Sequence, residues 1–455
     1  MDREERKFSS RLDLITSPQA FASMYSRLLC SLLAIALGVL PATAATRPNV
    51  IFILADDYGW KDLGCYGSTF YETPNLNRLA AQGMRFTQAY AACCVCSPTR
   101  ASILSGKYPA RLHITDWLPG RADNPRQMLN HPIITQHLPL EEVTLAEALK
   151  AADYGTGLVG KWHLGGPGFY PQDQGFDLNF GGSENGATPS FFSPYNVFKR
   201  KSLRPFTMPN LPNGPDGEYL TDRLTDEALK FIEQSKDKPF FLYLAHYAVH
   251  TPHEAKETMI EKYRTKAEAL PASGPEFLPE HDRMSRQVQN HPVYAAMIQS
   301  LDEGVGRILD KLEQLGLDKQ TVIFFTSDNG GLTTSEGSPT SNLPLRAGKG
   351  WNYEGGIREP LLVKWPGVTS PGSVCDSPII STDYYPTILE IAGLPARPDQ
   401  HLDGASFASL LKGASRPNRP LFWHYPHYSN QGGRPSGAMR NGDFKLIESY
   451  EDMHV

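Results

Sequence analysis

Three cysteines lie within four positions of one another in the segment CCVCSPTR, which continues as ASILSGKYP. Cys93, Cys94 and Cys96 could form a zinc site, a redox pair or a disulfide, or one of them could be a nucleophile. Zinc is disfavoured because no second Cys/His pair follows at zinc-finger spacing. A disulfide from Cys93 or Cys94 is expected, with Cys65 and Cys375 as the available partners, and the sequence does not choose among the pairings.

The residues after these cysteines predict a helix. Ser97 is a good N-cap, Pro98 suits the first helical position, and Gly106 can end the helix. Cys96 would then lie just outside the helix N-terminus, where a thiolate is stabilised and therefore reactive. Arg100, in the first turn, could reach back toward residue 96 and a bound oxyanion.

Four apolar, β-rich runs each end in polar side chains. Residues 50–55 lead to Asp56 and Asp57, and residues 322–325 lead to Asp328 and Asn329. Residues 240–245 lead to His246 and His250. The GTGLVG segment leads to Lys161 and His163. Continuous apolar runs of this length are typical of strands buried on both faces of a parallel sheet. Ligands bind beyond the carboxyl ends of such strands, so the four endings are expected to form one site.

Amphipathic helices are predicted between these strands. In ETPNLNRLAAQG, Thr73 can cap the helix, Pro74 can begin it and Gly83 can end it. The segments LTDRLTDEALKFIEQ and YAAMIQSLDEGVGRILDKLEQLG each place their apolar residues on one stripe. The fold class is therefore α/β, with a large, mostly parallel sheet covered by helices on both faces.

Asp56, Asp57, Asp328 and Asn329 offer three carboxylates and one amide oxygen. Each pair alone could be an ordinary turn. Together they are the hard-oxygen ligands that suit Ca²⁺ or Mg²⁺, and clustered carboxylates need a cation to offset their repulsion.

Length and composition limit the class of protein. The chain has 455 residues and a formal net charge of -5, so it carries no overall basic field and no nucleic-acid partner is expected.

The segment SRLLCSLLAIALGVLPATAATRPNV predicts a signal peptide, and we assign residues 1–44 to this peptide together with an N-terminal extension. The mature protein is expected to be exported, periplasmic or secreted, without stable membrane insertion. The absence of an Asn-x-Ser/Thr sequon favours a bacterial over a lysosomal protein.

The pattern Cys96-Ser97-Pro98-Thr99-Arg100 resembles the characteristic motif of the type I, formylglycine-dependent sulfatases. The segments ADDYGW, GKWHLG, HTPH, SDNGG and GKGWNYEGGIREP also match this arylsulfatase-like family of the alkaline phosphatase superfamily, in the family's order. The resemblance implies that a formylglycine-generating or equivalent maturation enzyme converts Cys96 to formylglycine. It also implies that one Ca²⁺ ion is held by the four oxygen ligands and by residue 96.

The resemblance implies a role for each remaining site residue. Hydrated formylglycine at position 96 would attack sulfur with assistance from Asp328, giving a sulfated enzyme intermediate. His250 and Lys349 would protonate the leaving alcohol, and His163 would take the proton whose loss expels sulfate. Lys161 and Arg100 would hold the diol and its charge. His246 and His253 are expected to be supporting or substrate-facing residues.

Three stretches outside these segments are predicted to be long loops, at residues 118–140, 183–218 and 333–348. The second loop is either a solvated insertion or a wall of the cleft, where Lys199, Arg200, Lys201 and Arg204 would meet further sulfates. We assign residues 45–395 to the catalytic domain and 396–455 to a partial C-terminal α+β subdomain with an antiparallel sheet. Compared with the family pattern, this subdomain is expected to be truncated.

The expected activity is hydrolysis of sulfate esters, on sulfated sugars or polysaccharides. A phosphonate or phosphate ester hydrolase of the same superfamily is one alternative. The other is an inactive protein that binds sulfated glycans.

Overall fold

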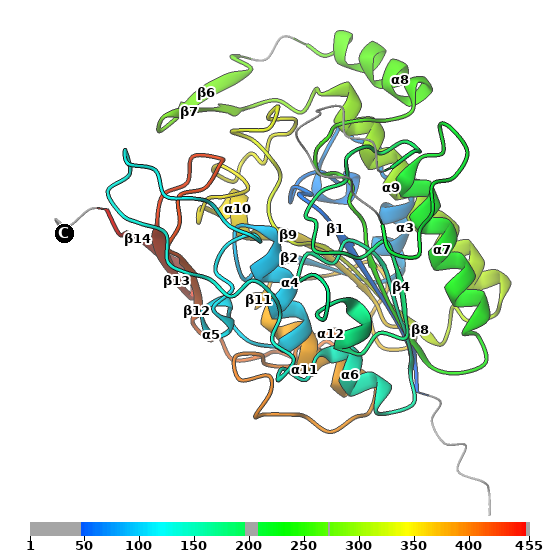
Figure 1. Ribbon diagram of the computed structural model, residues 1–455. Helices are drawn as coiled ribbons and strands as arrows, with labels where there is room; N and C mark the ends of the chain where they lie inside the picture. Colours follow the sequence, from blue (N-terminus) through cyan, green and yellow to red (C-terminus); the bar gives the residue numbers. More distant parts are fainter. Residues whose placement is uncertain (1–46, 196–207, 272–273, 452–455) are drawn as a thin grey trace, which may run out of the picture. The chain divides into compact units, whose positions relative to one another are not determined.

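The computed structural model describes residues 47–195, 208–271 and 274–451, so the predicted signal peptide and the four basic residues 199–201 and 204 lie outside the described residues. The main sheet comprises β1 (Asn49–Ala55), β2 (Met84–Tyr90), β3 (Gly155–Gly160), β4 (Leu178–Phe180), β5 (Phe240–Ala245), β8 (Thr321–Ser327), β9 (Arg358–Lys364), β10 (Ser373–Cys375) and β11 (Ile379–Ile380) (Figure 1). Its order is β10-β2-β9-β8-β1-β5-β3-β4, with β11 paired to β2. Only β9 is antiparallel to its neighbours β2 and β8, so the prediction of a mostly parallel sheet is confirmed.

Helices cover both faces of this sheet. They are α3 (Pro74–Gln82), α7 (Leu220–Gln234), α8 (Glu257–Glu268) and α9 (Pro292–Gln314) on one side, and α4 (Cys96–Ser105), α5 (Pro109–Leu112), α6 (Leu145–Lys150), α11 (Tyr384–Ile391) and α12 (Ala408–Leu411) on the other (Figure 1). Side chains alternate along β1, so Ile51 and Ile53 join the first core and Phe52 and Leu54 join the second.

The helix that follows β1 begins and ends where the sequence predicts, but its cap is different. Pro74 begins α3 and Gly83 follows its last residue. The predicted side-chain cap by Thr73 is wrong, because its hydroxyl accepts a hydrogen bond from the Gly64 N–H at 2.9 Å instead.

The described residues also form two small antiparallel sheets. One is the hairpin of β6 (Phe277–Glu280) and β7 (Arg283–Arg286), and the other has the order β12 (Leu421–Tyr425), β13 (Ser436–Asn441) and β14 (Phe444–Ser449). The second sheet confirms the antiparallel sheet predicted for the C-terminal region, whereas the boundary at residues 395/396 stays a prediction. The short helix α10 (Glu354–Ile357) precedes β9.

Among the described residues, no helix combines the length and apolar character that crossing a bilayer requires.

Candidate active site

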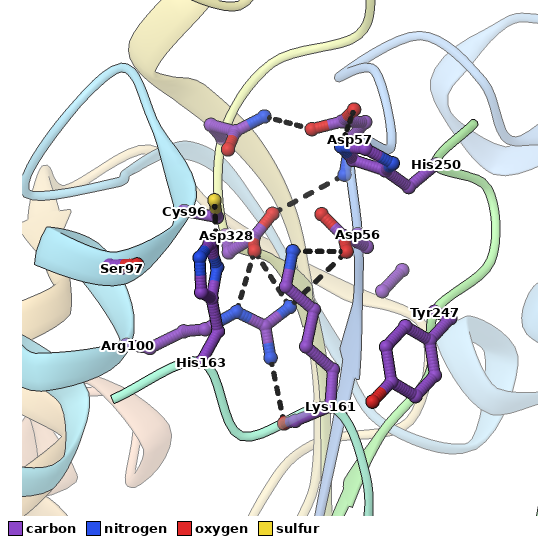
Figure 2. Close-up of polar contacts among 12 residues, drawn as sticks. Asp56, Asp57, Cys96, Ser97, Arg100, Lys161, His163, Tyr247, His250 and Asp328 are labelled. Atoms are coloured by element: carbon purple, nitrogen blue, oxygen red, sulfur yellow. Dashed lines mark hydrogen bonds and ion pairs between the residues drawn. The ribbon is translucent and has the colours of Figure 1, made fainter. Parts of the chain in front are cut away.

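The strand order explains why the predicted residues meet. Strands β8, β1, β5 and β3 are adjacent and parallel, so their carboxyl ends share one edge of the sheet. Figure 2 shows side chains from these endings converging with Cys96 and Arg100 of α4. The predicted site residues that the structure brings together are Asp56, Asp57, Cys96, Arg100, Lys161, His163, His250, Asp328, Asn329 and Lys349.

Each carboxylate of the site has its own cationic partner. Lys161 Nζ lies 2.6 Å from Asp56 Oδ2, and Lys349 Nζ lies 2.8 Å from Asp57 Oδ1. The guanidinium of Arg100 contacts Asp328 Oδ2 at 2.7 Å. All six groups are buried, so these charges interact with little solvent screening.

Asp57 illustrates how these charges act on its pKa. Burial acts to raise the pKa of Asp57, but Lys349 and then His250 outweigh this effect and hold the pKa below its ordinary value. Its backbone φ of 59° lies in the left-handed region, and its N–H donates to Asp328 Oδ1 at 3.3 Å. The two acidic endings of β1 and β8 are therefore joined directly.

The oxygen cluster fits a divalent cation. Asp56 Oδ1 and Asn329 Oδ1 are buried and have no hydrogen-bond partner among the described residues. Asn329 Nδ2 donates to Asp57 Oδ1 at 2.7 Å, which holds the amide against the carboxylates. Ligand atoms of Asp56, Asp57 and His250 also lie within 4.8 Å of one another. Carboxylate and amide oxygens are ligands that Ca²⁺ prefers, and these two have no competing hydrogen bond in the described residues.

The start of α4 differs from the sequence prediction. The helix begins at Cys96 after the extended residue Val95, so Cys96 is not outside the helix and Ser97 is not its N-cap. The Ser97 hydroxyl instead accepts a hydrogen bond from the Leu118 N–H at 3.1 Å, which ties loop 118–140 to the helix. Burial raises the pKa of the Cys96 thiol more than the nearby lysines lower it, so the expected acidified thiolate is wrong for the unmodified side chain.

His163 is held as a base that faces residue 96. Its Nε2–H donates to the Leu118 carbonyl at 2.6 Å, which leaves Nδ1 as the acceptor 3.4 Å from Cys96 Sγ. Burial, followed by the charge of Lys161, lowers the pKa of His163 well below its ordinary value. The imidazole is therefore neutral near pH 7 and can take a proton at Nδ1.

The disulfide prediction is wrong, because all five described cysteines have free thiols. The candidates lie in three separate apolar clusters: Cys93 and Cys94 pack with Trp423, Cys375 packs against the core that contains α4, and Cys65 packs against the core on the opposite side of the sheet. Cys93 and Cys96 have Cys-x-x-Cys spacing, but Cys93 is a core residue and Cys96 faces His163.

A cleft of about 620 Å³ opens above residue 96. Its lining contains predicted site residues and residues that the sequence analysis missed: Cys96, His163, His250 and Lys349, together with Trp117, Gln136, Glu184, Asn185, Thr251, Glu336, Asn430 and Gln431. Parts of all three predicted loops line this cleft, which favours the cleft-wall interpretation for the described part of loop 183–218. His246 and His253 are not among its lining residues, so their expected substrate-facing role is not supported.

Comparison with known proteins assigns this chain to one family. The family model for sulfatases matches residues 48–394, and a model for the C-terminal part of N-sulphoglucosamine sulphohydrolase matches residues 347–455. The chain therefore belongs to the sulfatase family, and it is an enzyme that hydrolyses sulfate esters.

Individual relatives agree with this assignment. Human arylsulfatase A is 34% identical, over 91% of this chain and 76% of its own length. Mouse N-acetylgalactosamine-6-sulfatase is 35% identical, over 86% of this chain and 71% of its own length. The crystal structure of Ps i-CgsB in complex with k-i-k-neocarrahexaose has a TM-score of 0.72 and 30% identity, covering 89% of this chain and 85% of that one.

Proposed function

We propose that this enzyme removes sulfate from sulfated sugars, with Cys96 converted to formylglycine and one Ca²⁺ ion held by Asp56, Asp57, Asp328 and Asn329. The observation that carries the proposal is the position of Cys96, whose Sγ lies 3.4 Å from the acceptor nitrogen of His163 in the lining of the cleft. The relatives whose names specify a sugar substrate or a bound saccharide support the substrate class.

The two proposed groups would each supply specific chemistry. A Ca²⁺ ion would draw charge from the oxygens bound to it and so favour a nucleophile near neutral pH. A hydrated aldehyde at residue 96 would offer one hydroxyl to attack sulfur and a second whose proton can be removed.

The side chains of Arg100 and Lys161 hold the strand endings and α4 in place. Arg100 contacts Asp328 and also donates to the Lys161 carbonyl at 3.2 Å, so it fixes the ends of β8 and β3 relative to α4. Lys161 and Arg100 also place positive charge beside the position where the sulfate anion must bind. Both side chains are buried and neither is among the cleft-lining residues, so their charge would orient the reacting group from beneath the cleft surface.

Three residues are positioned to transfer protons. His163 would accept a proton at Nδ1, because its Nε2–H is already committed to the Leu118 carbonyl. His250 and Lys349 line the cleft and would protonate the leaving sugar oxygen. General acid assistance of this type typically contributes a factor of about 10²–10⁴ to the rate.

The remaining parts of the proposal concern the route to the active enzyme. The signal-like N-terminal segment supports export to the periplasm or the medium. The Cys-Ser-Pro-Thr-Arg segment supports recognition by a formylglycine-generating or equivalent maturation enzyme.

Mass spectrometry and a substrate panel test this function. The protein would be co-expressed with a maturation enzyme, and the peptide containing Cys96 would show the aldehyde. Assays would then compare defined sulfated saccharides with phosphonate esters, and we expect sulfate release from the saccharides to dominate. Cys96→Ala should lose turnover while remaining folded, and Cys375→Ala, outside the cleft, is the matched control.

Three results would contradict the proposal. Near-normal turnover by Cys96→Ala would refute the mechanism, and preferred cleavage of phosphonate esters would refute the substrate class. An intact thiol at residue 96, with saccharide binding but no sulfate release, would indicate a binding protein.

A further inference from the structure

Asp116, His131 and His427 form a second cluster of metal-binding side chains outside the cleft. Each offers one ligand atom, and these atoms lie within 4.8 Å of one another. Asp116 and His427 are buried, and His131 is half-buried. The three residues come from the segment after α5, from loop 118–140 and from the segment after β12, so only the fold brings them together.

The distances within the cluster suit a zinc ion. His131 Nδ1 lies 3.2 Å from His427 Nδ1, and His427 Nδ1 lies 3.9 Å from Asp116 Oδ2. Zinc binds imidazole nitrogen at about 2.0–2.1 Å with tetrahedral geometry, which separates two ligand nitrogens by about 3.3 Å. The histidine pair therefore already has the required spacing, and Asp116 Oδ2 lies about half an ångström too far from His427 Nδ1 for that geometry.

The carboxylate of Asp116 has a free oxygen that faces this pair. Its Oδ1 accepts hydrogen bonds from the Trp117 N–H at 2.9 Å and from the Tyr425 hydroxyl at 3.1 Å. Its Oδ2 is buried without a hydrogen-bond partner in the described part of the chain, and the side chain is fully buried. A buried carboxylate oxygen without a donor is costly, and a bound cation would remove that cost.

The hydroxyl of Thr115 can orient the ring of His427. Thr115 Oγ1 lies 2.8 Å from His427 Nε2, so it can accept the Nε2–H proton and leave the Nδ1 lone pair directed toward His131. Metal-binding histidines commonly donate their other ring N–H in this way.

We propose that Asp116, His131 and His427 bind one Zn²⁺ ion, and that the ion joins loop 118–140 to the segment that follows β12. Two histidines and one carboxylate are ligands that zinc accepts, and three protein ligands leave one position open. A cavity of about 390 Å³, which all three residues line, provides room for water in that position.

The ion would stabilise a wall of the active site. Pro119 and Gln136 line both this cavity and the catalytic cleft. The same loop begins at Leu118, whose carbonyl accepts the hydrogen bond from His163 Nε2. The zinc site itself does not depend on the reaction proposed for the cleft.

Zinc titration of the full chain tests this inference. Metal-stripped protein would be titrated with Zn²⁺ in excess Ca²⁺, so that the oxygen site is filled and cannot take zinc. We expect one Zn²⁺ per chain, and binding at least about tenfold weaker for His131→Ala. Thr115→Val keeps the three ligands and should weaken binding by about 10- to 100-fold. His424→Ala, on the adjacent strand β12 and outside the cluster, should bind like the wild type.

Cobalt gives an independent readout of the geometry. Co²⁺ bound to the wild type should show the strong visible absorption of a tetrahedral ion, and His131→Ala should lose it. Equal zinc binding by the wild type and His131→Ala would overturn the proposal, as would no zinc binding by the wild type. The histidines would then form only a hydrogen-bonded pair. Equal melting temperatures of the zinc-free proteins would show that the variant is folded.

Discussion

The charges in the catalytic cleft are balanced in pairs, which sets how strongly a cation can bind there. Asp56, Asp57 and Asp328 are each matched by a buried lysine or arginine. The Ca²⁺ ion that we propose would therefore gain less from net charge than it would at three isolated carboxylates. It would depend on oxygens such as Asp56 Oδ1, which has no hydrogen-bond donor among the described residues. This balance favours an ion that can be exchanged with solvent.

We therefore predict that chelation inactivates the mature enzyme and that Ca²⁺ restores its activity. At a Ca²⁺ concentration one hundred times the dissociation constant, the free energy of unfolding should rise by about 2.7 kcal/mol, because only the folded state binds the ion. Urea unfolding with and without Ca²⁺ measures this gain. Asp56→Asn should lose the gain, whereas Asp310→Asn at the exposed ion pair with Arg78 should keep it. An equal gain in both variants would place the ion elsewhere.

Glu359 on β9 makes a second prediction at the residue scale. It is buried, and neither carboxylate oxygen has a hydrogen-bond partner within the described residues. Burial, reinforced by Asp328 and Asp57, raises the pKa of Glu359 well above its ordinary value. The folded protein then keeps its proton at pH values where the unfolded chain has lost it. This contribution to stability is complete below the unfolded pKa and is lost as the pH rises toward the folded pKa.

The expected slope can be measured by urea unfolding from about pH 5 to about pH 8. Across the window between the two pKa values, Glu359 should remove about 1.4 kcal/mol of unfolding free energy per pH unit. Glu359→Gln should abolish that component, whereas Glu257→Gln at an exposed position should retain it. Parallel pH profiles for the wild type and Glu359→Gln would mean that the carboxylate is ionised in the folded protein.

At the scale of elements, α4 is buried along its whole length, unlike the other long helices. Every residue from Cys96 to Ser105 is buried, so the helix has no solvent-facing stripe that periodicity could reveal. Its end could nevertheless be predicted, because Gly106 adopts a φ of 72° that favours glycine. Its start could not, because the Ser97 hydroxyl is engaged by a loop residue distant in sequence.

Gly106→Ala should therefore weaken the helix that carries residue 96. A Cβ atom there would lie 2.4 Å from the His401 Cβ, in addition to the strain of a positive φ. Gly413 has a φ of 80° and nothing within 4 Å of such a Cβ. Gly413→Ala therefore measures the cost of the positive φ alone, without a steric clash. We expect a loss of about 1–2 kcal/mol for Gly413→Ala and about 1–3 kcal/mol more for Gly106→Ala in urea unfolding. Equal losses would show that the segment carrying His401 moves aside.

At the scale of the whole described region, a residue of the site can be predicted when the sequence pattern that indicates it lies next to it in the chain. The strands β1, β5 and β8 and the residues that follow them are predictable, because each apolar run and its polar ending are adjacent in sequence. The cleft residues Asn430 and Gln431 are not, because they reach the site only through packing of the C-terminal sheet. The free thiols of Cys93 and Cys94 were missed for the same reason.

The packing of that sheet gives the last prediction. Trp423 of β12 is 4% exposed, and its indole N–H donates to the Ala91 carbonyl at 2.8 Å. Its ring packs in the cluster that contains Cys93, Cys94 and Val95, the residues directly before the site cysteine. Trp423→Ala should therefore lower stability by about 3–5 kcal/mol, through the lost contacts and the cavity left behind. A small displacement of residue 96 should also lower kcat/KM by about tenfold to a hundredfold.

The adjacent residue of the same strand provides the control for this prediction. Phe422 points to the opposite face and is 48% exposed, so Phe422→Ala should cost less than about 1 kcal/mol and leave kcat/KM unchanged. Urea unfolding and steady-state desulfation at a temperature where both variants are folded give the comparison. If Trp423→Ala loses stability but keeps its kcat/KM, the C-terminal sheet supports the fold without positioning residue 96. A loss of both shows that the C-terminal sheet, which packs against Cys93 and Cys94, also holds residue 96 in place.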